Sequence, residues 1–322
     1  MFAFKQVPLR KSKESDATLA KLESFLDREA PKLSTILSTI FEGQQNAITY
    51  KELREAALDG YEKQIQQWQV EYADFVNDTL APLWKKAMDE AAEALNQKLY
   101  GLLVFDDSDV FVKDWLQKHG AEFVTNIGGQ TRSAIKSILF LGQYEEWTAE
   151  KIAQMIRPCI GLTRPDALAN ARYQQHVYNS LLKQGVKESA AARRAHEAAL
   201  KYAARQHRAR ADMIANTELA YAYNRGTHES VRQAMRGGLM GPCVKVWSTA
   251  GSERVCSHCS SLNGKRIGFD ESFDIPGRIL FEGMRQTPPA HPRCRCAVKY
   301  VEISPPQRQA ELEIAARKKK VV

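Results

Sequence analysis

Four of the chain's six cysteines fall in one stretch that begins with Cys256 and ends with Cys296. The stretch opens with a Cys-x-x-Cys motif, whose tight turn aims two sulfur atoms at one ion, and it closes with a histidine and two more cysteines. Zinc in structural sites takes four such sulfur and imidazole ligands in a tetrahedral arrangement. The sequence therefore predicts a zinc site, for which it offers five candidate ligands: Cys256, Cys259, His291, Cys294 and Cys296.

Which four of these five would bind is open from the sequence alone. His258 lies inside the first turn and is expected to point away from the ion. Cys294 and Cys296 would share one face of a strand, because side chains alternate along a strand, so an all-cysteine site is feasible. A site that uses His291 and one of these two cysteines is feasible as well. Two metal-free alternatives also stand: reduced thiols without a ligand, and a disulfide formed only after cell lysis.

The wider composition favours a metal over a disulfide. The chain has 322 residues, of which 44% are hydrophobic and 26% charged, as in a folded protein of one or two domains. It shows neither an apolar run of membrane-spanning length nor the pattern of a signal peptide. We therefore expect no membrane contact and a reducing cytosol, where clustered thiols bind metals. The remaining cysteines, Cys159 and Cys243, are predicted to be small buried packing residues.

The motifs predict a structural metal and no enzymatic activity. Neither the His-x-Glu of zinc deaminases nor the His-Glu-x-x-His of metalloproteases occurs in the chain. Four thiolate or imidazole ligands also leave no open coordination position for water or substrate. The alternative from the enzyme class is a metal-dependent nuclease or another enzyme that acts on DNA. Its candidate acid–base residues are Glu218, His228 and His291.

The metal motif is expected to lie in a small β-rich module of residues 241–304. Hydrophobicity alternates through VKVWST and again through RCRCAVKYVEI, which predicts two strands, and Trp247 in the first is assigned a structural role. Asn263-Gly264 between them favours a type I′ hairpin turn. A module this small has little core of its own. Zinc would compensate, because a structural Zn²⁺ contributes roughly 10 kcal/mol or more of binding free energy linked to folding.

The first two thirds of the chain are predicted to be helical. Apolar residues recur at three- and four-residue steps, which predicts a helical arm over residues 1–104 and a second helical block over 105–240. Thr148 and Thr163 are expected N-caps, and Gly185 is an expected C-cap. Breaks or bends are expected at Pro31, Gly43, Gly60, Pro82 and the pair Gly128–Gly129.

One long Ala-rich helix is predicted over residues 187–235, and it leads into the metal module. His207 lies on its apolar stripe and is expected to pack rather than to bind a ligand. Glu218 is assigned a structural role, either as a buried partner of Arg225 or as a solvated position. The predicted fold class is α+β: helices over the first two thirds, then a β-rich, zinc-stapled module, then a basic tail over 305–322.

The formal charge of +8 at pH 7 and the pI near 9.1 favour a polyanionic partner. The positive charge concentrates on the long helix and beside the metal motif. Such residues would hold phosphate groups without base specificity and with strong salt dependence. The predicted DNA-contacting set is Arg193, Arg194, Lys201, Arg205, Arg208, Arg210, Arg293 and Arg295.

Four segments resemble, in order and at suitable distances, the Mu F-like phage head-morphogenesis (minor head protein) family: GLTRPDALANARY, RARADMIANTELAYAYNRG, VWST…VCSHCSSLNGKRI and PPAHPRCRCAV. The resemblance covers about residues 120–304. Its most specific element pairs Cys-x-x-Cys-x-x-Leu-x-Gly with a later Pro-x-His-Pro-x-Cys-x-Cys. The family has Asp-x-Arg-x-Cys before the first motif, whereas this chain reads Gly251-Ser252-Glu253-Arg254-Val255-Cys256, so it lacks the aspartate.

The resemblance implies a low-copy minor protein of a tailed-phage capsid. Its implied partners are the portal protein, other capsid or scaffold components, and double-stranded DNA bound without sequence preference. It implies a part in head morphogenesis and in DNA packaging or delivery. The protein would assemble in the host cytoplasm and end in the virion, inside the capsid or at the portal vertex. The helical arm would dock on portal or scaffold. A cellular DNA-binding module unrelated to phage is the third alternative.

Overall fold

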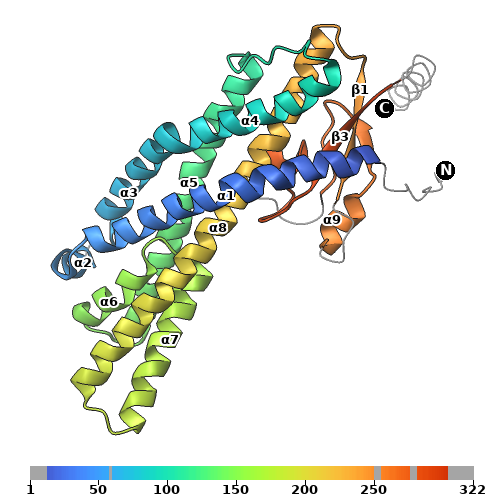
Figure 1. Ribbon diagram of the computed structural model, residues 1–322. Helices are drawn as coiled ribbons and strands as arrows, with labels where there is room; N and C mark the ends of the chain where they lie inside the picture. Colours follow the sequence, from blue (N-terminus) through green and yellow to red (C-terminus); the bar gives the residue numbers. More distant parts are fainter. Residues whose placement is uncertain (1–12, 58–59, 250–254, 276–280, 304–322) are drawn as a thin grey trace, which may run out of the picture. The chain divides into compact units, whose positions relative to one another are not determined.

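The computed structural model describes residues 13–57, 60–249, 255–275 and 281–303, and its α+β class is the predicted one (Figure 1). The described helices are α1 (Lys13–Ala47), α2 (Tyr50–Ala56), α3 (Glu62–Phe75), α4 (Ala81–Asn96), α5 (Val110–Tyr144), α6 (Ala149–Ile156), α7 (Arg164–Lys183), α8 (Glu188–Arg236) and α9 (Ser257–Leu262). A π-helical segment, η1 (Val76–Leu80), joins α3 to α4, and three short 3₁₀ turns are η2 (Gln97–Leu99), η3 (Arg157–Cys159) and η4 (Glu282–Arg285). Within these ranges, no helix has the length and apolar character that crossing a bilayer requires.

Contacts group the chain into two compact units, each made of separate stretches. The first unit takes in residues up to Arg28, residues 83–113 and the chain from Asn216 onward, and it contains the sheet. The second unit takes in residues 29–82 and 114–215 and is helical wherever it has regular structure. The predicted boundaries at 104 and 240 fall inside the first unit, so the units interleave along the chain instead of following one another. The predicted basic tail, 305–322, lies outside the described residues.

The predicted helix caps are confirmed. Thr148 Oγ1 accepts a hydrogen bond from the Lys151 amide at 3.3 Å, and α6 begins directly after it. Thr163 Oγ1 accepts one from the Asp166 amide at 3.4 Å at the start of α7. Gly185 follows α7 with φ +79°, the left-handed conformation that glycine adopts at helix C-termini. The long helix is also confirmed, since α8 covers Glu188–Arg236.

Several positions at which a break or bend was expected do not end a helix. Helix α1 runs through Pro31 and Gly43, and α5 runs through Gly128–Gly129. At Gly128 the reason is packing, because a Cβ there would lie 2.9 Å from the Gln69 side chain on α3. The glycine permits this close approach without ending the helix. Gly60, in contrast, does mark a turn, with φ +72° between α2 and α3.

Three antiparallel strands form the sheet, in the order β2 (Arg266–Gly268), β1 (Cys243–Ser248), β3 (Ala297–Glu302). The predicted type I′ hairpin turn is wrong, because α9 lies between β1 and β2. Asn263 has φ −57° and ψ 125°, Gly264 has φ +77°, and the Lys265 amide donates to the Leu262 carbonyl at 2.9 Å. These values describe a type II turn, which needs glycine at its third position.

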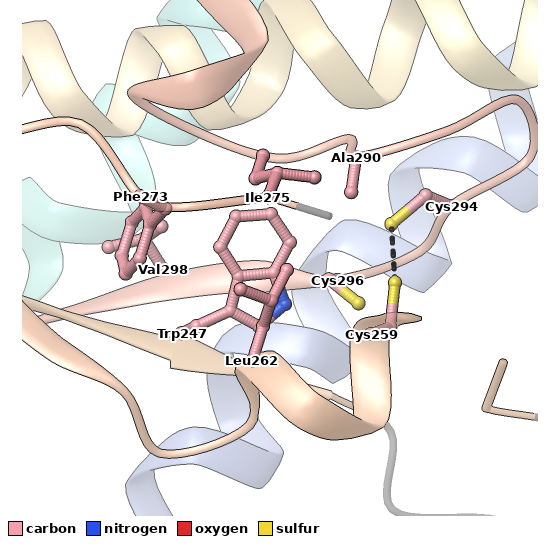
Figure 2. Packing of buried hydrophobic residues seen from close by; sticks show 9 residues of the cluster. All are labelled: Trp247, Cys259, Leu262, Phe273, Ile275, Ala290, Cys294, Cys296 and Val298. Atoms are coloured by element: carbon pink, nitrogen blue, oxygen red, sulfur yellow. Dashed lines mark hydrogen bonds between the residues drawn. The ribbon is translucent and has the colours of Figure 1, made fainter. Parts of the chain in front are cut away.

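Behind the sheet, a small apolar cluster includes cysteines of the metal motif (Figure 2). Trp247 is fully buried, and its ring meets that of Phe273 edge-on, with centroids 5.0 Å apart. The buried members are Trp247, Cys259, Leu262, Phe273, Ile275, Ala290, Cys294, Cys296 and Val298. Three of the five candidate metal ligands, Cys259, Cys294 and Cys296, are therefore part of the module core, and Cys256 packs against it.

Candidate metal centre

The five candidate ligands come together in two groups that share Cys259. Cys256, Cys259 and His291 form one group, and Cys259, Cys294 and Cys296 form the other, with ligand atoms in each group lying within 4.8 Å of one another. The two ends of the motif, which are 35 residues apart in sequence, thus meet at one place. A four-ligand site around Cys259 must draw on both groups.

The start of α9 positions the first two cysteines. Cys256 is the N-cap of this helix, with extended backbone angles of φ −66° and ψ 158°, and its sulfur accepts a hydrogen bond from the Cys259 amide at 3.4 Å. The same turn directs His258 to the outside, where it is exposed. The Cys-x-x-Cys spacing therefore places two sulfurs on one side of the first helical turn and leaves the intervening histidine in solvent.

His291 presents its Nε2 atom to these sulfurs. Nε2 lies 3.1 Å from Cys256 Sγ and 3.2 Å from Cys259 Sγ, while Nδ1 lies 2.8 Å from the Pro292 carbonyl oxygen. A carbonyl oxygen can only accept, so Nδ1 carries the proton and Nε2 has a free lone pair. Metal-binding histidines are oriented in this way, with the second nitrogen donating to a carbonyl or carboxylate.

Cys294 and Cys296 reach the cluster from a loop, and the prediction that they lie in a strand is wrong. Strand β3 begins only at Ala297, and Arg293 has φ +59°, which turns the chain before the cysteines. The loop is held on α8 at two places. Thr217 Oγ1 accepts from the Arg293 amide at 3.0 Å, and the Asn224 side-chain amide donates to the Cys296 carbonyl at 3.1 Å.

The sulfur geometry fits a tetrahedral zinc ion. Two sulfurs bound to one zinc at 2.3 Å lie about 3.8 Å apart in a tetrahedron, and Cys259 Sγ and Cys294 Sγ are 3.7 Å apart (Figure 2). Hydrogen bonds from the thiols of Cys259 and Cys296 hold the pKa of Cys294 well below its ordinary range. Hydrogen bonding to Cys294 raises that of Cys259. The donor set, three buried thiols with a thiol and an imidazole beside them, is one that zinc prefers.

Trp247 supplies a further sign of fit. Its indole Nε1 is buried and has no hydrogen-bond partner among the described residues. In Figure 2 the indole nitrogen is turned toward the side on which Cys296 lies. A buried N–H is costly when unpaired, and a thiolate sulfur at Cys296 is an acceptor that would satisfy it whether or not Cys296 binds the metal.

The two residues with proposed structural roles, Glu218 and Trp247, are both buried, at 3% and 0% exposure. Arg225 forms its ion pair with Glu229, whose carboxylate oxygen lies 2.7 Å from Nη2, rather than the predicted pair with Glu218. Spacing explains the difference, since Glu229 lies one helical turn from Arg225 and Glu218 lies two turns away.

Sequence reasoning missed a buried polar group within the metal module, Lys245. Its Nζ donates to the backbone carbonyls of Glu271 at 2.6 Å and Gln286 at 3.0 Å, and burial lowers its pKa to about 8. The available signal was the strand alternation, which puts Lys245 on the face of Trp247. Every residue of that face in β1 is buried, whereas Val246 on the other face is only partly buried.

Two of the predicted nuclease residues, His228 and His291, lie in different side-chain clusters. His228 is fully buried and stacks on Phe269 with ring centroids 4.3 Å apart, and its Nδ1 lies 2.9 Å from the Tyr300 hydroxyl. His291 belongs to the thiol cluster. Each of these two histidines thus has structural contacts of its own.

The predicted DNA-contacting residues divide into exposed and engaged groups. Arg193, Arg194, Lys201, Arg205 and Arg208 are exposed on α8. Arg210 is a correction to this set, since it is 3% exposed, donates to the carbonyl of Gly161 and to Gln130 Oε1, and covers the Phe41 ring. It faces the core because it lies on the same side of α8 as His207, one turn earlier.

The other two predicted DNA contacts lie beside the metal motif. Arg295 pairs with Asp27 at 3.0 Å and donates to Asn216 at 3.2 Å, so its charge is partly used inside the first unit. The Arg293 side chain is exposed. The departure from the family pattern at Arg254 lies outside the described residues.

Residues 171–299 match the family described as phage Mu protein F like protein. This segment begins within α7, later than the residue 120 from which the motifs suggested a resemblance, and it includes all five candidate ligands. No curated protein and no solved structure matches the chain. The family resemblance predicted from the motifs is confirmed for residues 171–299, the segment assigned to the phage Mu protein F like family.

Proposed function

We propose that this protein is a non-enzymatic minor component of a tailed-phage head. A structural zinc ion would crosslink its C-terminal module. The observation that carries the proposal is that all five candidate ligands meet inside the segment that matches the family. Family membership supports a role in phage head morphogenesis and a place in the virion. The thiol cluster supports a module held together by a metal.

The zinc ion would be held by Cys256, Cys259 and His291 together with one cysteine of the later pair. Cys294 is the preferred fourth ligand, because its sulfur contacts that of Cys259 at 3.7 Å, whereas Cys296 lies toward the Trp247 indole. The ion would supply a crosslink between α9 and the loop before β3. With four protein ligands it would have no position left for a substrate, which agrees with a structural role.

The partners are proposed from the family assignment and from charge. The portal protein and other capsid or scaffold components are the expected protein partners, and the helical part before the matched segment is the expected docking arm. The exposed cations of α8 would hold double-stranded DNA through its phosphates, which would give strong salt dependence and little sequence preference. Assembly would take place in the host cytoplasm, and the protein would remain inside the capsid or at the portal vertex.

Crosslinking of assembled heads tests this proposal. Heads made with the wild-type protein are expected to contain it in few copies and to give crosslinks between the part before residue 171 and the portal protein. Heads that assemble and fill with DNA equally well without the protein, together with no portal crosslinks, would contradict it.

A plasmid-cleavage assay separates the enzyme alternative. We expect no cutting by the purified protein with Mg²⁺ or Mn²⁺. Cutting that disappears in Glu218→Ala or His291→Ala would establish the nuclease and remove the structural proposal.

A further inference from the structure

A basic groove in the second unit, remote in sequence from the metal motif, has no role in the proposed function. It lies between α5 and the start of α7, is open to solvent and has a volume of about 510 Å³. The residues that line it are Gly129, Arg132, Ser133, Lys136, Ser137, Phe140, Leu141, Arg164 and Leu168. Three of them are cations, two carry hydroxyl groups, and none is acidic.

Two of the three cations are unpaired. Arg132 forms an ion pair with Glu62 at 2.7 Å, but Lys136 and Arg164 are exposed and have no ion-pair partner in the part of the chain that the structure describes. The acid nearest to Arg164 in sequence is Asp166, which already accepts a hydrogen bond from the Thr163 hydroxyl at 2.6 Å. The groove therefore carries a net positive charge that the described protein residues do not neutralise.

The charges follow a line along the groove. Arg132, Lys136 and Phe140 are spaced by four residues on one face of α5, which corresponds to about 6 Å of rise at each step. Arg164 faces them as the first residue of α7, where the helix dipole also favours an anion. An extended chain of negative groups fits this arrangement better than a single compact ion.

Phe140 adds an aromatic surface at the same groove. Its side chain is 72% exposed, although a large apolar ring gains nothing from contact with water. A basic groove that follows a phosphate backbone, next to an exposed aromatic ring on which a base stacks, is the combination used to bind single-stranded nucleic acid. A duplex keeps its bases stacked inside and would leave the ring unused.

We propose that the α5/α7 groove binds single-stranded DNA without sequence preference, with Arg132, Lys136 and Arg164 on the phosphates and Phe140 stacked on a base. This site is separate from the exposed cations of α8, to which duplex binding was assigned above, and it does not depend on the portal or zinc proposals.

Fluorescence anisotropy of a labelled oligo-dT with the full-length protein tests the site. Lys136→Glu/Arg164→Glu is expected to abolish binding, and Lys136→Gln/Arg164→Gln is expected to reduce the slope of log K against log salt by about 1.4, the value for two phosphate contacts on a single strand. Phe140→Ala should weaken binding by roughly 5- to 100-fold and leave the salt slope unchanged.

The matched control is Lys201→Glu/Arg205→Glu on α8, which makes the same change in charge in the same unit. It should retain most of the oligo-dT affinity and lose affinity for a duplex. Circular dichroism melting verifies that every variant is folded. Four results would each overturn the proposal. The Gln or Glu groove variants could keep an oligo-dT affinity within twofold of wild type, or the α8 control could lose as much affinity as they do. The wild type could fail to bind oligo-dT at low salt, or it could prefer a duplex whether or not Phe140 is present.

Discussion

Removal of the shared ligand Cys259 should destabilise the first unit far more than removal of another buried cysteine. Cys259 is the one ligand common to both groups among the described residues, so Cys259→Ala leaves neither group complete and removes the thiol that joins them. Cys243 is an appropriate control, because it lies in the same unit and is 4% exposed against 2% for Cys259, yet belongs to neither group. Cys243→Ala removes the same atoms without touching the crosslink.

The size of the effect follows from the loop that the metal closes. Cys259 and Cys294 are separated by 35 residues. A covalent crosslink closing a loop of that length reduces the chain entropy of the unfolded state by about 4 kcal/mol in free energy. A metal crosslink that holds the same two ends is expected to have a similar effect. In a unit of this size, about 4 kcal/mol corresponds to a fall in Tm of roughly 8–16 °C.

Differential scanning calorimetry and elemental analysis of freshly purified, reduced protein provide the measurement. We expect close to one zinc per wild-type chain, none in Cys259→Ala, and a chelator-induced fall in Tm that Cys259→Ala does not show. The reasoning is refuted if the wild-type chain holds no zinc and Cys259→Ala melts within a few degrees of Cys243→Ala.

Three further predictions concern packing, charge and pH. Gly226→Ala should destabilise the protein by roughly 3 kcal/mol because its Cβ would overlap the Met88 backbone, whereas Gly129→Ala, in an open helical position, should stabilise it by about 1 kcal/mol; urea titration measures both. Arg210→Ala should lower the free energy of unfolding by about 3 kcal/mol and leave duplex DNA affinity unchanged. Arg208→Ala, at an exposed position, should leave the free energy of unfolding unchanged and weaken duplex DNA binding. Burial lowers the pKa of His207 to about 4 from 6.5, so the unfolded chain binds its proton first and stability falls as pH drops from 6.5 to 4. Urea titrations across that range should show about 3 kcal/mol less pH dependence in His207→Gln than in the wild type, and equal pH dependence would contradict the assignment.

Local signals in the sequence were sufficient where one residue or one short motif controls the outcome. The caps at Thr148 and Thr163 depend on a side chain that bonds an amide three residues later, and the predicted starts of α6 and α7 were correct. The Cys-x-x-Cys turn also depends on neighbours in sequence. The same kind of reasoning failed at Pro31 and Gly128–Gly129, where α1 and α5 continue, and at Gly128 the glycine serves the close approach of the Gln69 side chain instead of ending the helix.

The sequence by itself determined the α+β class, the long helix, the set of five candidate ligands and the family, since periodicity and motif spacing are properties of neighbouring residues. The tertiary structure decided which of those residues meet. It brought Cys256 into contact with His291, and Cys259 into contact with Cys294, although the residues of each pair are 35 apart in sequence. It also buried the side chains of Arg210 and Lys245 and placed Lys136 and Arg164 on opposite sides of one groove. These outcomes depend on contacts between helices and loops distant in sequence, and burial decides whether a charged side chain serves the core or a partner.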